Sequence, residues 1–563
     1  MISRAAALAK LSSLEQAPVL IVGAGINGIG TFRDLALQGV DVVMVDRADF
    51  CSGASMASSH MLHGGIRYLE NGEFRLVREA LHERNRLLAN APHLTAPLPT
   101  VIPIYKRFSG VLNAPLKFLG LLDRPSERGA LVIKLGLMLY DGFVRRNNPL
   151  PGHDFFARES ALAAWPELNP EILYAARYYD GFMPSPERIC MELIGDGERD
   201  HVGAIALNYA PVIGMEKDQV IIETEEGGEI RLSPRIVINA AGPWIDFANR
   251  RFQENTDFIG GTKGSHLILD HPRLREALED HEFFFEYFDG RIVLILPYFD
   301  KVMIGTTDIR INDPDEARCT EEEIDYMLGM VPKVFPEIEV GREDIIFQFS
   351  GVRPLPSAKG KSTGQISRDH QLEVLEPAED RPYAIMNLIG GKWTTYRAFS
   401  EQVSDEVLRR LNRRRRASTA DLAIGGGAGY PSSVEKRDEW VEERAMESPM
   451  PAGYIRQLLE RYGTRADRYL AAAESSDDGM LSDAPYYSGA EIRFLVENER
   501  VKHLEDVLLR RTSLAWTGAV SSELLSRVSE LTGEWLAWTP AQRQSELDRA
   551  ARILHEDHGL KLD

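Results

Sequence analysis

Apolar runs that end in glycine-rich or polar turns dominate the first part of the chain. Residues 19–22 (Val-Leu-Ile-Val) form one such run, and residues 29–38 behind it have the apolar spacing of a helix. A second apolar run occupies residues 40–45. A parallel strand is covered on both faces, so its sequence is apolar throughout. This order of strand, helix and strand therefore predicts an α/β fold with a parallel sheet.

The remaining pattern divides the chain into further elements. Residues 73–90 predict a helix, with Phe74, Val77, Leu81 and Leu88 on one face. Residues 454–563 are almost wholly helical in pattern, and the Arg- and Gly-rich residues 408–433 before them have the composition of a linker. Additional strands are predicted at 204–207, 219–224, 237–240, 290–296 and 301–306.

The turn after the first strand carries a glycine motif, Gly23-x-Gly25-x-x-Gly28. In a dinucleotide site these glycines allow a tight turn, close approach of the backbone to a pyrophosphate, and close packing of helix on strand. The second strand ends in Asp46, 18 residues beyond Gly28, where a carboxylate that binds a ribose is expected. The helix amino terminus adds N–H groups for the phosphates. We infer that an adenine dinucleotide binds here.

Composition and charge limit the other possibilities. With 563 residues, the chain is expected to form two or three domains. A net charge of −20 argues against nucleic-acid binding through the general surface. Only Cys51, Cys190 and Cys319 are present, without a C-x-x-C pair. We therefore expect reduced thiols in a cytoplasmic compartment, no disulfide framework and no metal site.

A basic, apolar segment is unusual in so acidic a chain. Residues 103–147 contain eight Lys or Arg residues and three acidic ones, together with several Leu and Phe residues. The apolar run 131–140 is interrupted by Lys134 and is too short to span a bilayer. Such a segment would suit peripheral contact with an anionic membrane. Packing as a helical part of a substrate domain explains it equally well.

Beyond the glycine motif, further motifs follow in order along the chain. They are residues 58–70 (Ser-Ser-His-Met-Leu-His-Gly-Gly-Ile-Arg-Tyr-Leu-Glu), 239–244 (Asn-Ala-Ala-Gly-Pro-Trp), 263–266, 304–308, 350–355 (Ser-Gly-Val-Arg-Pro-Leu), 366–369, 390–397 (Gly-Gly-Lys-Trp-Thr-Thr-Tyr-Arg) and 505–512. In this order they resemble the FAD-dependent (respiratory, aerobic-type) glycerol-3-phosphate dehydrogenase family, and the resemblance extends over nearly the whole chain.

The resemblance implies a tightly held FAD, oxidation of sn-glycerol 3-phosphate to dihydroxyacetone phosphate, and transfer of the electrons to membrane quinone. It implies a Rossmann-like FAD-binding domain of the glutathione-reductase/D-amino-acid-oxidase type, a β-rich substrate domain and an all-α carboxy-terminal domain. We expect the FAD-binding domain at 17–100, 185–250 and 345–400, the substrate domain at 101–184 and 251–344, a linker at 401–433 and the helical domain at 434–563.

The motifs indicate candidate residues for substrate binding, catalysis and cofactor binding. For the substrate phosphate we expect Arg67, Arg353 and Arg368, because guanidinium groups meet phosphate oxygens bidentately, with Tyr68 as a further donor. His266 is the candidate base that removes the hydroxyl proton, although a structural role is an equal alternative; Arg353 and Lys392 would stabilise negative charge. The predicted cofactor-binding residues are Gly23, Gly25, Asn27, Gly28, Asp46, Arg47, Ser58, His63, Gly64, Gly65, Ala241, Gly242, Gly391, Lys392 and Thr394.

Some positions depart from the usual family pattern. His60 stands where Lys is common, Trp393 replaces the usual Leu, and residues 178–188 lack an acidic pair. A related polyol phosphate, such as a tetritol phosphate, therefore remains an alternative substrate, and oxygen an alternative acceptor. A non-catalytic flavin-binding protein is a third reading. The sequence also leaves open a homodimer and attachment to the cytoplasmic face of the inner membrane.

Overall fold

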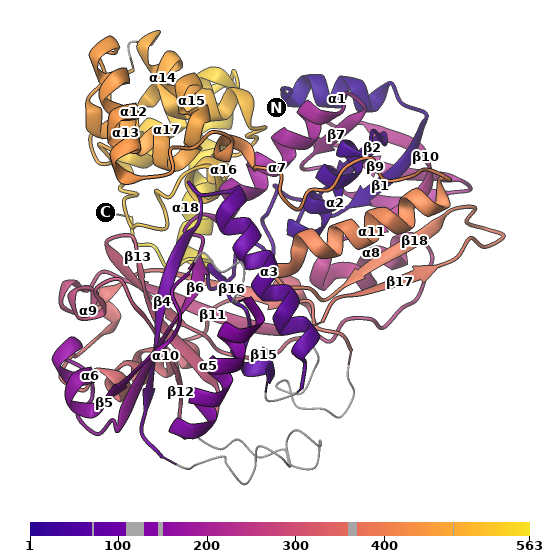
Figure 1. The fold of residues 1–563 in the computed structure, drawn as a ribbon. Helices are drawn as coiled ribbons and strands as arrows, with labels where there is room; N and C mark the ends of the chain where they lie inside the picture. Colours follow the sequence, from indigo (N-terminus) through magenta and orange to yellow (C-terminus); the bar gives the residue numbers. More distant parts are fainter. Residues whose placement is uncertain (70–71, 108–128, 145–149, 358–368, 477, 563) are drawn as a thin grey trace.

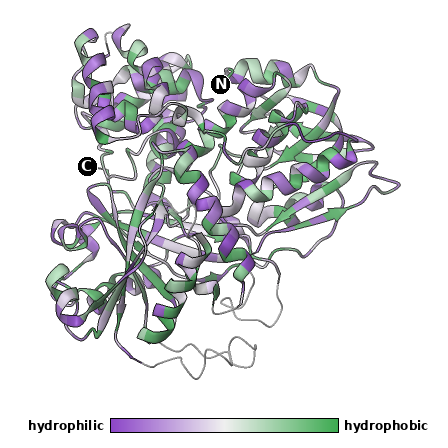
Figure 2. Ribbon diagram, in the orientation of Figure 1, coloured by the Kyte–Doolittle hydropathy of each residue, from purple (hydrophilic) through white to green (hydrophobic). Residues whose placement is uncertain are grey.

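The structure is a computed structural model, and it describes residues 1–69, 72–107, 129–144, 150–357, 369–476 and 478–562. Figure 1 shows two sheets that lie side by side, with a group of helices from the end of the chain above them. The strands of both sheets are largely apolar, whereas the covering helices alternate apolar and polar segments (Figure 2). No helix among the described residues has the length and apolar character needed to cross a membrane.

The first sheet is the predicted parallel sheet. Strands β18, β10, β1, β2 and β7 run parallel in that order, and β17 adds an antiparallel edge. A hairpin of β8 and β9 extends β10. The strands are β1 (Gln16–Val22), β2 (Val42–Val45), β7 (Ala204–Leu207), β8 (Val212–Glu216), β9 (Gln219–Glu223), β10 (Glu229–Asn239), β17 (Gln371–Leu375) and β18 (Ala384–Ile389).

Helices complete this first unit. Helix α2 connects β1 to β2 and packs against α7 and α11, so the β1–α2–β2 unit has the predicted order. Residues Ile29, Phe32 and Leu35 of α2 are fully buried. The helices around the sheet are α1 (Arg4–Ser12), α2 (Ile26–Leu37), α7 (Pro186–Asp200), α8 (Ile245–Arg251) and α11 (Tyr396–Arg410).

The second sheet is mostly antiparallel, in the order β15–β11–β14–β13–β12–β4–β6–β3, with β16 beside β11 and β5 beside β6. Its strands are β3 (Met61–Leu62), β4 (Ala96–Ile104), β5 (Asp154–Ala157), β6 (Tyr174–Phe182), β11 (Thr262–Leu269), β12 (Glu282–Glu286), β13 (Ile292–Tyr298), β14 (Lys301–Gly305), β15 (Ile309–Arg310) and β16 (Ile345–Arg353). The helices are α3 (Phe74–Asn90), α5 (Ala130–Val144), α6 (Arg158–Ala164), α9 (Pro272–Leu278) and α10 (Glu321–Val334), with a 3₁₀ turn η1 (Ile66–Leu69).

The carboxy-terminal helices form the third unit, as expected for an all-α domain. They are α12 (Val434–Glu447), α13 (Ala452–Tyr462), α14 (Ala466–Glu474), α15 (Gly489–Asn498), α16 (Leu504–Asp506), α17 (Ser522–Trp535) and α18 (Pro540–Glu556). Ile492, Leu495, Val507 and Leu508 are fully buried in its core. A π-helical turn over Val507–Arg511 carries Arg510 and Arg511 toward the first sheet.

Some chain segments lie elsewhere than the predicted domain boundaries put them. Strand β16, within the segment assigned to the FAD-binding domain, pairs along its length with β11 in the second sheet. Strands β3 and β4 also belong to that sheet. Residues 401–410 of the predicted linker form the second half of α11, because Val403 and Val407 are buried against the first sheet's helices.

Candidate active site

A large cavity, of about 2030 Å³, is lined by residues of both sheets. Its walls come from the β1–α2 turn, the loop after β2, the turn η1, strands β11 and β16, and the Gly390–Thr394 loop. The carboxy-terminal domain adds Glu505 and Arg510 at one end. Parallel β1, β2 and β10 end at this cavity, which is where α/β sheets of this type bind their ligands.

At the glycine motif the cavity wall is formed by backbone, because the glycines have no side chains. Gly23 has a φ of +108°, and a Cβ there would lie 2.6 Å from the Ala240 carbonyl oxygen. A Cβ on Gly28 would lie 2.1 Å from the Gly23 carbonyl oxygen, so no side chain fits between helix and strand. The Ile26 N–H donates to Ser55 Oγ over 2.9 Å. The N-terminal turn of α2 thus faces the cavity, as a pyrophosphate-binding turn requires.

Asp46 stands at the end of β2 on the cavity wall. Its carboxylate accepts the Ala24 N–H at 2.6 Å and the Ala48 N–H at 2.9 Å. Burial raises the pKa of Asp46 to about 6, although these two N–H groups act in the opposite direction. The neighbouring Arg47 turns toward the second sheet, where it pairs with Asp315 and lies 4.6 Å from the Trp244 ring centre.

The Gly390–Thr394 loop forms another part of the wall, next to the glycine motif. Gly390 and Gly391 have φ values of +71° and +94°, and the Gly390 carbonyl oxygen accepts from Asn27 Nδ2 at 3.3 Å. The Thr394 hydroxyl donates to the His63 carbonyl oxygen at 3.3 Å. These contacts hold the loop against both the glycine motif and the loop before η1.

Two cationic groups and a phenol line the cavity. Lys392 Nζ lies 3.7 Å from the centre of the Tyr68 ring, a cation–π contact. Arg353, at the end of β16, donates to Thr306 Oγ1 at 3.1 Å and pairs with Asp308 at 3.3 Å. A Cβ on Gly264 would lie 2.3 Å from Arg353 Nη2. The guanidinium group can therefore occupy this position only because residue 264 has no side chain.

His266, in the middle of β11, also lines the cavity. Its ring stacks on Phe349 with a centre distance of 4.8 Å, and its Nε2 atom lies 2.8 Å from Ser59 Oγ. Its Nδ1 atom is buried and has no hydrogen-bond partner among the described residues. Burial, and then the charge of Arg353, lower the pKa of His266 well below its ordinary value, so the imidazole is neutral at pH 7.

A buried carboxylate binds side chains next to these residues. Glu323, at the start of α10, accepts hydrogen bonds from Ser265 Oγ at 2.9 Å and Thr307 Oγ1 at 2.6 Å. It also pairs with Lys263 at 2.7 Å. Glu323 thereby fixes β11 beside the segment that contacts Arg353. Locally, Glu323 forms a capping box with Thr320 at the start of α10, but its partners in the site lie 16 to 60 residues away, so the sequence alone did not connect it with the site.

Most of the predicted site residues share the cavity wall. Gly28 packs between helix and strand instead, and Gly64 donates its N–H to Tyr140 and Asp180 at 3.0 and 3.1 Å. Arg368 and the side chain of Arg67 lie outside the described residues, so their predicted phosphate contacts stay predictions. The predicted residues on the wall are Gly23, Gly25, Asn27, Asp46, Arg47, Ser58, His63, Gly65, Tyr68, Ala241, Gly242, His266, Arg353, Gly391, Lys392 and Thr394.

Comparisons with known proteins agree with this architecture. Residues 18–397 match the family model of FAD dependent oxidoreductases, and residues 417–543 match that of the C-terminal domain of alpha-glycerophosphate oxidase. A glycerol-3-phosphate dehydrogenase of Synechocystis is 32% identical over 96% of this chain and 95% of its own length. The chain belongs to the FAD-dependent glycerol-3-phosphate dehydrogenase family.

Other members of this glycerol-3-phosphate dehydrogenase family confirm the extent of the match. The human mitochondrial glycerol-3-phosphate dehydrogenase is 28% identical over 99% of this chain and 76% of its own length. A D-erythritol 1-phosphate dehydrogenase of Brucella abortus is 31% identical over 88% of this chain and 94% of its own. The crystal structure of the Bacillus halodurans glycerol-3-phosphate dehydrogenase with FAD has the same fold (TM-score 0.76, 22% identity, 98% and 97% of the two chains).

FAD is the cofactor of this glycerol-3-phosphate dehydrogenase family, and the cavity of this chain fits it. The glycine turn would receive the pyrophosphate, and Asp46 would hold a ribose hydroxyl. Beside the glycine motif, the backbone of Gly391 and the side chain of Lys392 would offer positive charge to a reduced flavin ring. Ser55, Ser59 and Trp244 also line the cavity although they were not predicted to do so.

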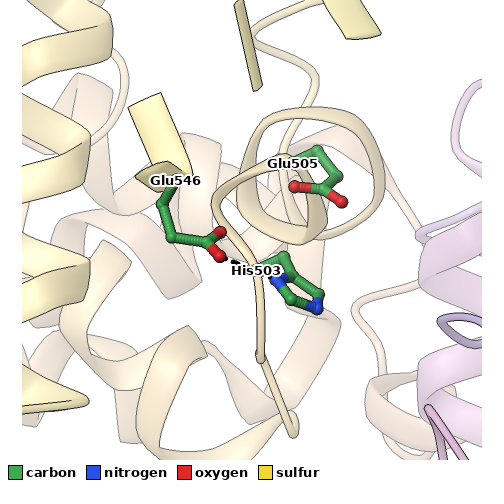
Figure 3. Close-up of side chains that lie close together, drawn as sticks. All are labelled: His503, Glu505 and Glu546. Carbon is green, nitrogen blue, oxygen red and sulfur yellow. Dashed lines mark hydrogen bonds and ion pairs between the residues drawn. The ribbon is translucent and has the colours of Figure 1, made fainter. Parts of the chain in front are cut away.

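One group of side chains outside this cavity has the composition of a metal site, although no metal was predicted. His503, Glu505 and Glu546 offer ligand atoms within 4.8 Å of one another (Figure 3). His503 Nδ1 lies 2.9 Å from Glu546, and its Nε2 lies 3.0 Å from Glu225 on the β9–β10 turn. Burial lowers the pKa of His503, but the hydrogen bond to Glu546 and the charges of Asp506 and Glu505 outweigh it and raise the pKa, which favours the imidazolium form that donates from both nitrogens. This family member thus uses His503 to join its first and third units.

Proposed function

We propose that the protein oxidises sn-glycerol 3-phosphate to dihydroxyacetone phosphate and passes the electrons to membrane quinone. The observation that carries the proposal is that Arg353, Lys392, Tyr68 and His266 line the same cavity as the glycine motif. Two cations beside a phenol suit a phosphorylated alcohol. The names of the Synechocystis and human relatives add support.

Oxidation of a secondary alcohol removes a hydride from carbon and a proton from the hydroxyl group. When bound, FAD supplies the hydride acceptor at its N5 atom. His266 is neutral and lies within the cavity, so its imidazole is able to take the hydroxyl proton. The hydrogen bond to Ser59 orients the ring, and Arg353 lowers the energy of the developing alkoxide.

An amphipathic helix supports peripheral attachment to the cytoplasmic face of the membrane. Ile133, Leu137 and Tyr140 of α5 are buried, and the outer face of this helix exposes large apolar side chains. These exposed residues are Leu131, Leu135, Met138 and Leu139, with fractions of 53%, 58%, 57% and 42%. The surrounding sequence, residues 103–147, has an excess of five positive charges. Apolar residues among cations suit an anionic bilayer surface.

A tetritol phosphate is the second candidate substrate. It is favoured by the Brucella relative, whose 31% identity nearly equals the 32% of the Synechocystis relative. Both substrates would use the same cations and the same base, and they differ only in the length of the carbon chain. The choice between them therefore depends on the space beyond the reacting carbon.

Anaerobic titration of the purified yellow protein tests the proposal. Glycerol 3-phosphate should bleach the flavin absorbance at lower concentration than erythritol 1-phosphate or erythritol 4-phosphate. Preferential bleaching by a tetritol phosphate would establish the second candidate, and no bleaching by any of them would indicate a non-catalytic flavoprotein. Parallel assays of a soluble quinone analogue and of hydrogen peroxide identify the acceptor. Rapid peroxide formation without quinone reduction would contradict the acceptor we propose.

A further inference from the structure

A buried group of three side chains lies directly behind the loop of residues 63–65, which connects β3 to η1. Asp180 of β6 is at its centre, and its Oδ1 atom accepts hydrogen bonds from Tyr140 Oη at 2.5 Å and from Arg84 Nη1 at 3.0 Å. Arg84 belongs to α3 and Tyr140 to α5, two helices that lie side by side and both pack against β6 and η1 (Figure 1). All three side chains are at most 2% exposed. We call these three residues the Asp180 group.

The Asp180 group binds one backbone N–H of the loop. The Gly64 N–H donates to Tyr140 Oη at 3.0 Å and to Asp180 Oδ1 at 3.1 Å. A Cβ on Gly64 would lie 2.3 Å from Tyr140 Oη and 2.4 Å from Leu81 Cδ2, so the loop backbone touches both helices. The Thr394 hydroxyl donates to the carbonyl oxygen of the preceding residue, His63. Two separate parts of the fold therefore fix this loop.

The residues that follow the loop are candidate substrate ligands. Gly65 has a φ of +78°, and its carbonyl oxygen accepts the Tyr68 N–H at 2.8 Å, within the turn η1. Tyr68 lines the large cavity beside Lys392, and Arg67 precedes it in η1. A displaced loop would therefore move Tyr68 and the backbone of Arg67. A misplacement of about 1 Å in an active site can cost roughly 10²-fold in rate.

Stability alone does not account for the ion pair between Arg84 and Asp180. A buried ion pair is often no more stable than apolar side chains of similar volume, because both charges lose their water. In some proteins buried charges instead give one geometry to the groups that they bind. Arg84 Nη1 also donates to the Tyr179 carbonyl oxygen at 2.8 Å, which ties it to the same strand as Asp180. The group therefore presents a fixed acceptor to the Gly64 N–H.

We propose that Asp180 is a positioning residue for the substrate: with Tyr140 and Arg84 it fixes the loop of residues 63–65, so that η1 meets the phosphorylated alcohol. This inference rests on the proposed function for the identity of the substrate, and it adds the part of the fold that orders the substrate site. The glycine turn and Asp46 would hold FAD elsewhere along the cavity. Loss of the Asp180 group should therefore weaken substrate binding and leave the FAD content unchanged.

Two variants remove the contacts in steps. Tyr140→Phe is the milder one, because it removes a hydroxyl group and keeps the ring. Asp180→Asn keeps the shape of the side chain but removes the charge that Arg84 neutralises. Tyr105→Phe is the matched control: the Tyr105 hydroxyl donates to the Lys333 carbonyl oxygen at 2.9 Å, in the same unit of the fold but away from the large cavity.

Two measurements on the FAD-loaded proteins test the proposal. Hydrogen–deuterium exchange of peptides that cover residues 61–69 reports on the loop. Anaerobic stopped-flow bleaching of the flavin at increasing glycerol 3-phosphate concentration gives the substrate Kd separately from the limiting rate of reduction. We expect faster exchange in both variants, with a Kd that rises at least fivefold in Tyr140→Phe and at least tenfold in Asp180→Asn. Tyr105→Phe should stay within twofold of wild type, and all three should keep the wild-type ratio of FAD to protein.

Wild-type exchange in both variants would overturn the proposal, and so would a Kd within twofold of wild type despite faster exchange. Loss of FAD from Tyr140→Phe would also overturn it, because the group would then support the cofactor site as a whole. If Asp180→Asn does not fold, Tyr140→Phe alone decides between these outcomes. A wild type that no polyol phosphate bleaches would refute the proposed function, whereas a bleached wild type with unchanged variants refutes only the role of the Asp180 group.

Discussion

His266 Nε2 and Ser59 Oγ are 2.8 Å apart, which joins the centre of the second sheet to the loop between β2 and β3. The histidine is the only candidate base among the residues predicted for catalysis. Because its pKa is lowered by burial, the ring stays uncharged and available to accept a proton. The contact therefore gives the predicted base a fixed orientation in the cavity.

Replacement of His266 by Asn should lower turnover by roughly 10²- to 10⁴-fold, the usual worth of a general base. The ratio of flavin to protein, measured from visible absorbance, should stay at the wild-type value. His555→Asn, on the exposed side of α18, is the control and should keep full turnover. Unchanged turnover in His266→Asn would eliminate His266 as the base.

The pH dependence of the wild type follows from the same residue. A base works only in its unprotonated form, and the pKa of His266 is lowered from its ordinary value near 6.5. Activity should therefore fall on the acid side only well below pH 6.5. A profile of kcat/KM from pH 4.5 to 9 measures this, and a midpoint at or above pH 6.5 would contradict a neutral, buried His266 as base.

Arg353→Lys tests the phosphate contact. Lysine keeps the charge but loses the planar fork, and a charge-assisted hydrogen bond contributes about 1.5 to 3 kcal/mol. The value of kcat/KM for the polyol phosphate should drop roughly 10- to 100-fold, mainly through a higher KM. Arg342→Lys, in an exposed ion pair with Glu321 and Asp325, provides the control. Equal steady-state kinetics for both variants would place the phosphate elsewhere.

Gly28→Ala should abolish FAD retention. The new Cβ would stand 2.1 Å from the Gly23 carbonyl oxygen, so helix and strand must separate and the pyrophosphate turn must move. Gly453→Ala has open space around its Cβ and should be neutral or stabilise α13 by about 0.5 to 1 kcal/mol. Flavin fluorescence after gel filtration distinguishes them. Retention of stoichiometric FAD by Gly28→Ala would show that this turn does not hold the cofactor.

His503 should make stability depend on pH. Burial and the charge of Arg549 lower the pKa of His503. The hydrogen bond to Glu546 and the charges of Asp506 and Glu505 raise it by more, so the pKa is raised overall. A raised folded-state pKa stabilises the fold fully below about pH 6.5, the unfolded value, and this contribution is lost as pH rises through the folded value. The difference in Tm between wild type and His503→Gln should shrink from pH 6 to pH 9. A constant difference would exclude a stabilising ion pair between charged His503 and Glu225 or Glu546.

Asp49→Asn should destabilise the contact between the first sheet's unit and the carboxy-terminal domain. Asp49 accepts from Arg510 at 2.6 Å and from Arg511 at 2.7 and 2.9 Å, and all three side chains are buried. Without the charge of Asp49, Arg510 keeps its pair with Asp506 at 2.5 Å, but the remaining carboxylate of Arg511 is Glu499 at 3.8 Å. Breaking this buried cluster should cost about 3 to 5 kcal/mol. Urea denaturation measures this cost. Asp315→Asn, in the exposed pair with Arg47, should change stability by less than about 1 kcal/mol.

The sequence predicted those parts of the fold and site that depend on neighbours along the chain. The glycine turn, Asp46 and the strand–helix–strand order are local, and their residues lie together on the cavity wall. Strand β16 was recognisable as part of a motif, but the sheet it joins depends on pairing with β11, which no local pattern encodes. Ser59 and Glu323 act on residues that the fold alone brings close. Arg47 follows Asp46 in sequence, yet its pair with Asp315 turns it toward the second sheet.

Asp49 lies three residues beyond Asp46 and lines the same cavity, yet the arginines that neutralise it follow 461 and 462 residues later. A ribosome adds about 5 to 20 residues per second, so roughly half a minute to a minute and a half of translation separates the carboxylate from its cations. During that interval the nascent nucleotide pocket carries an uncompensated charge. The cofactor can therefore be captured in a finished pocket only near the end of synthesis, when the final helices have emerged.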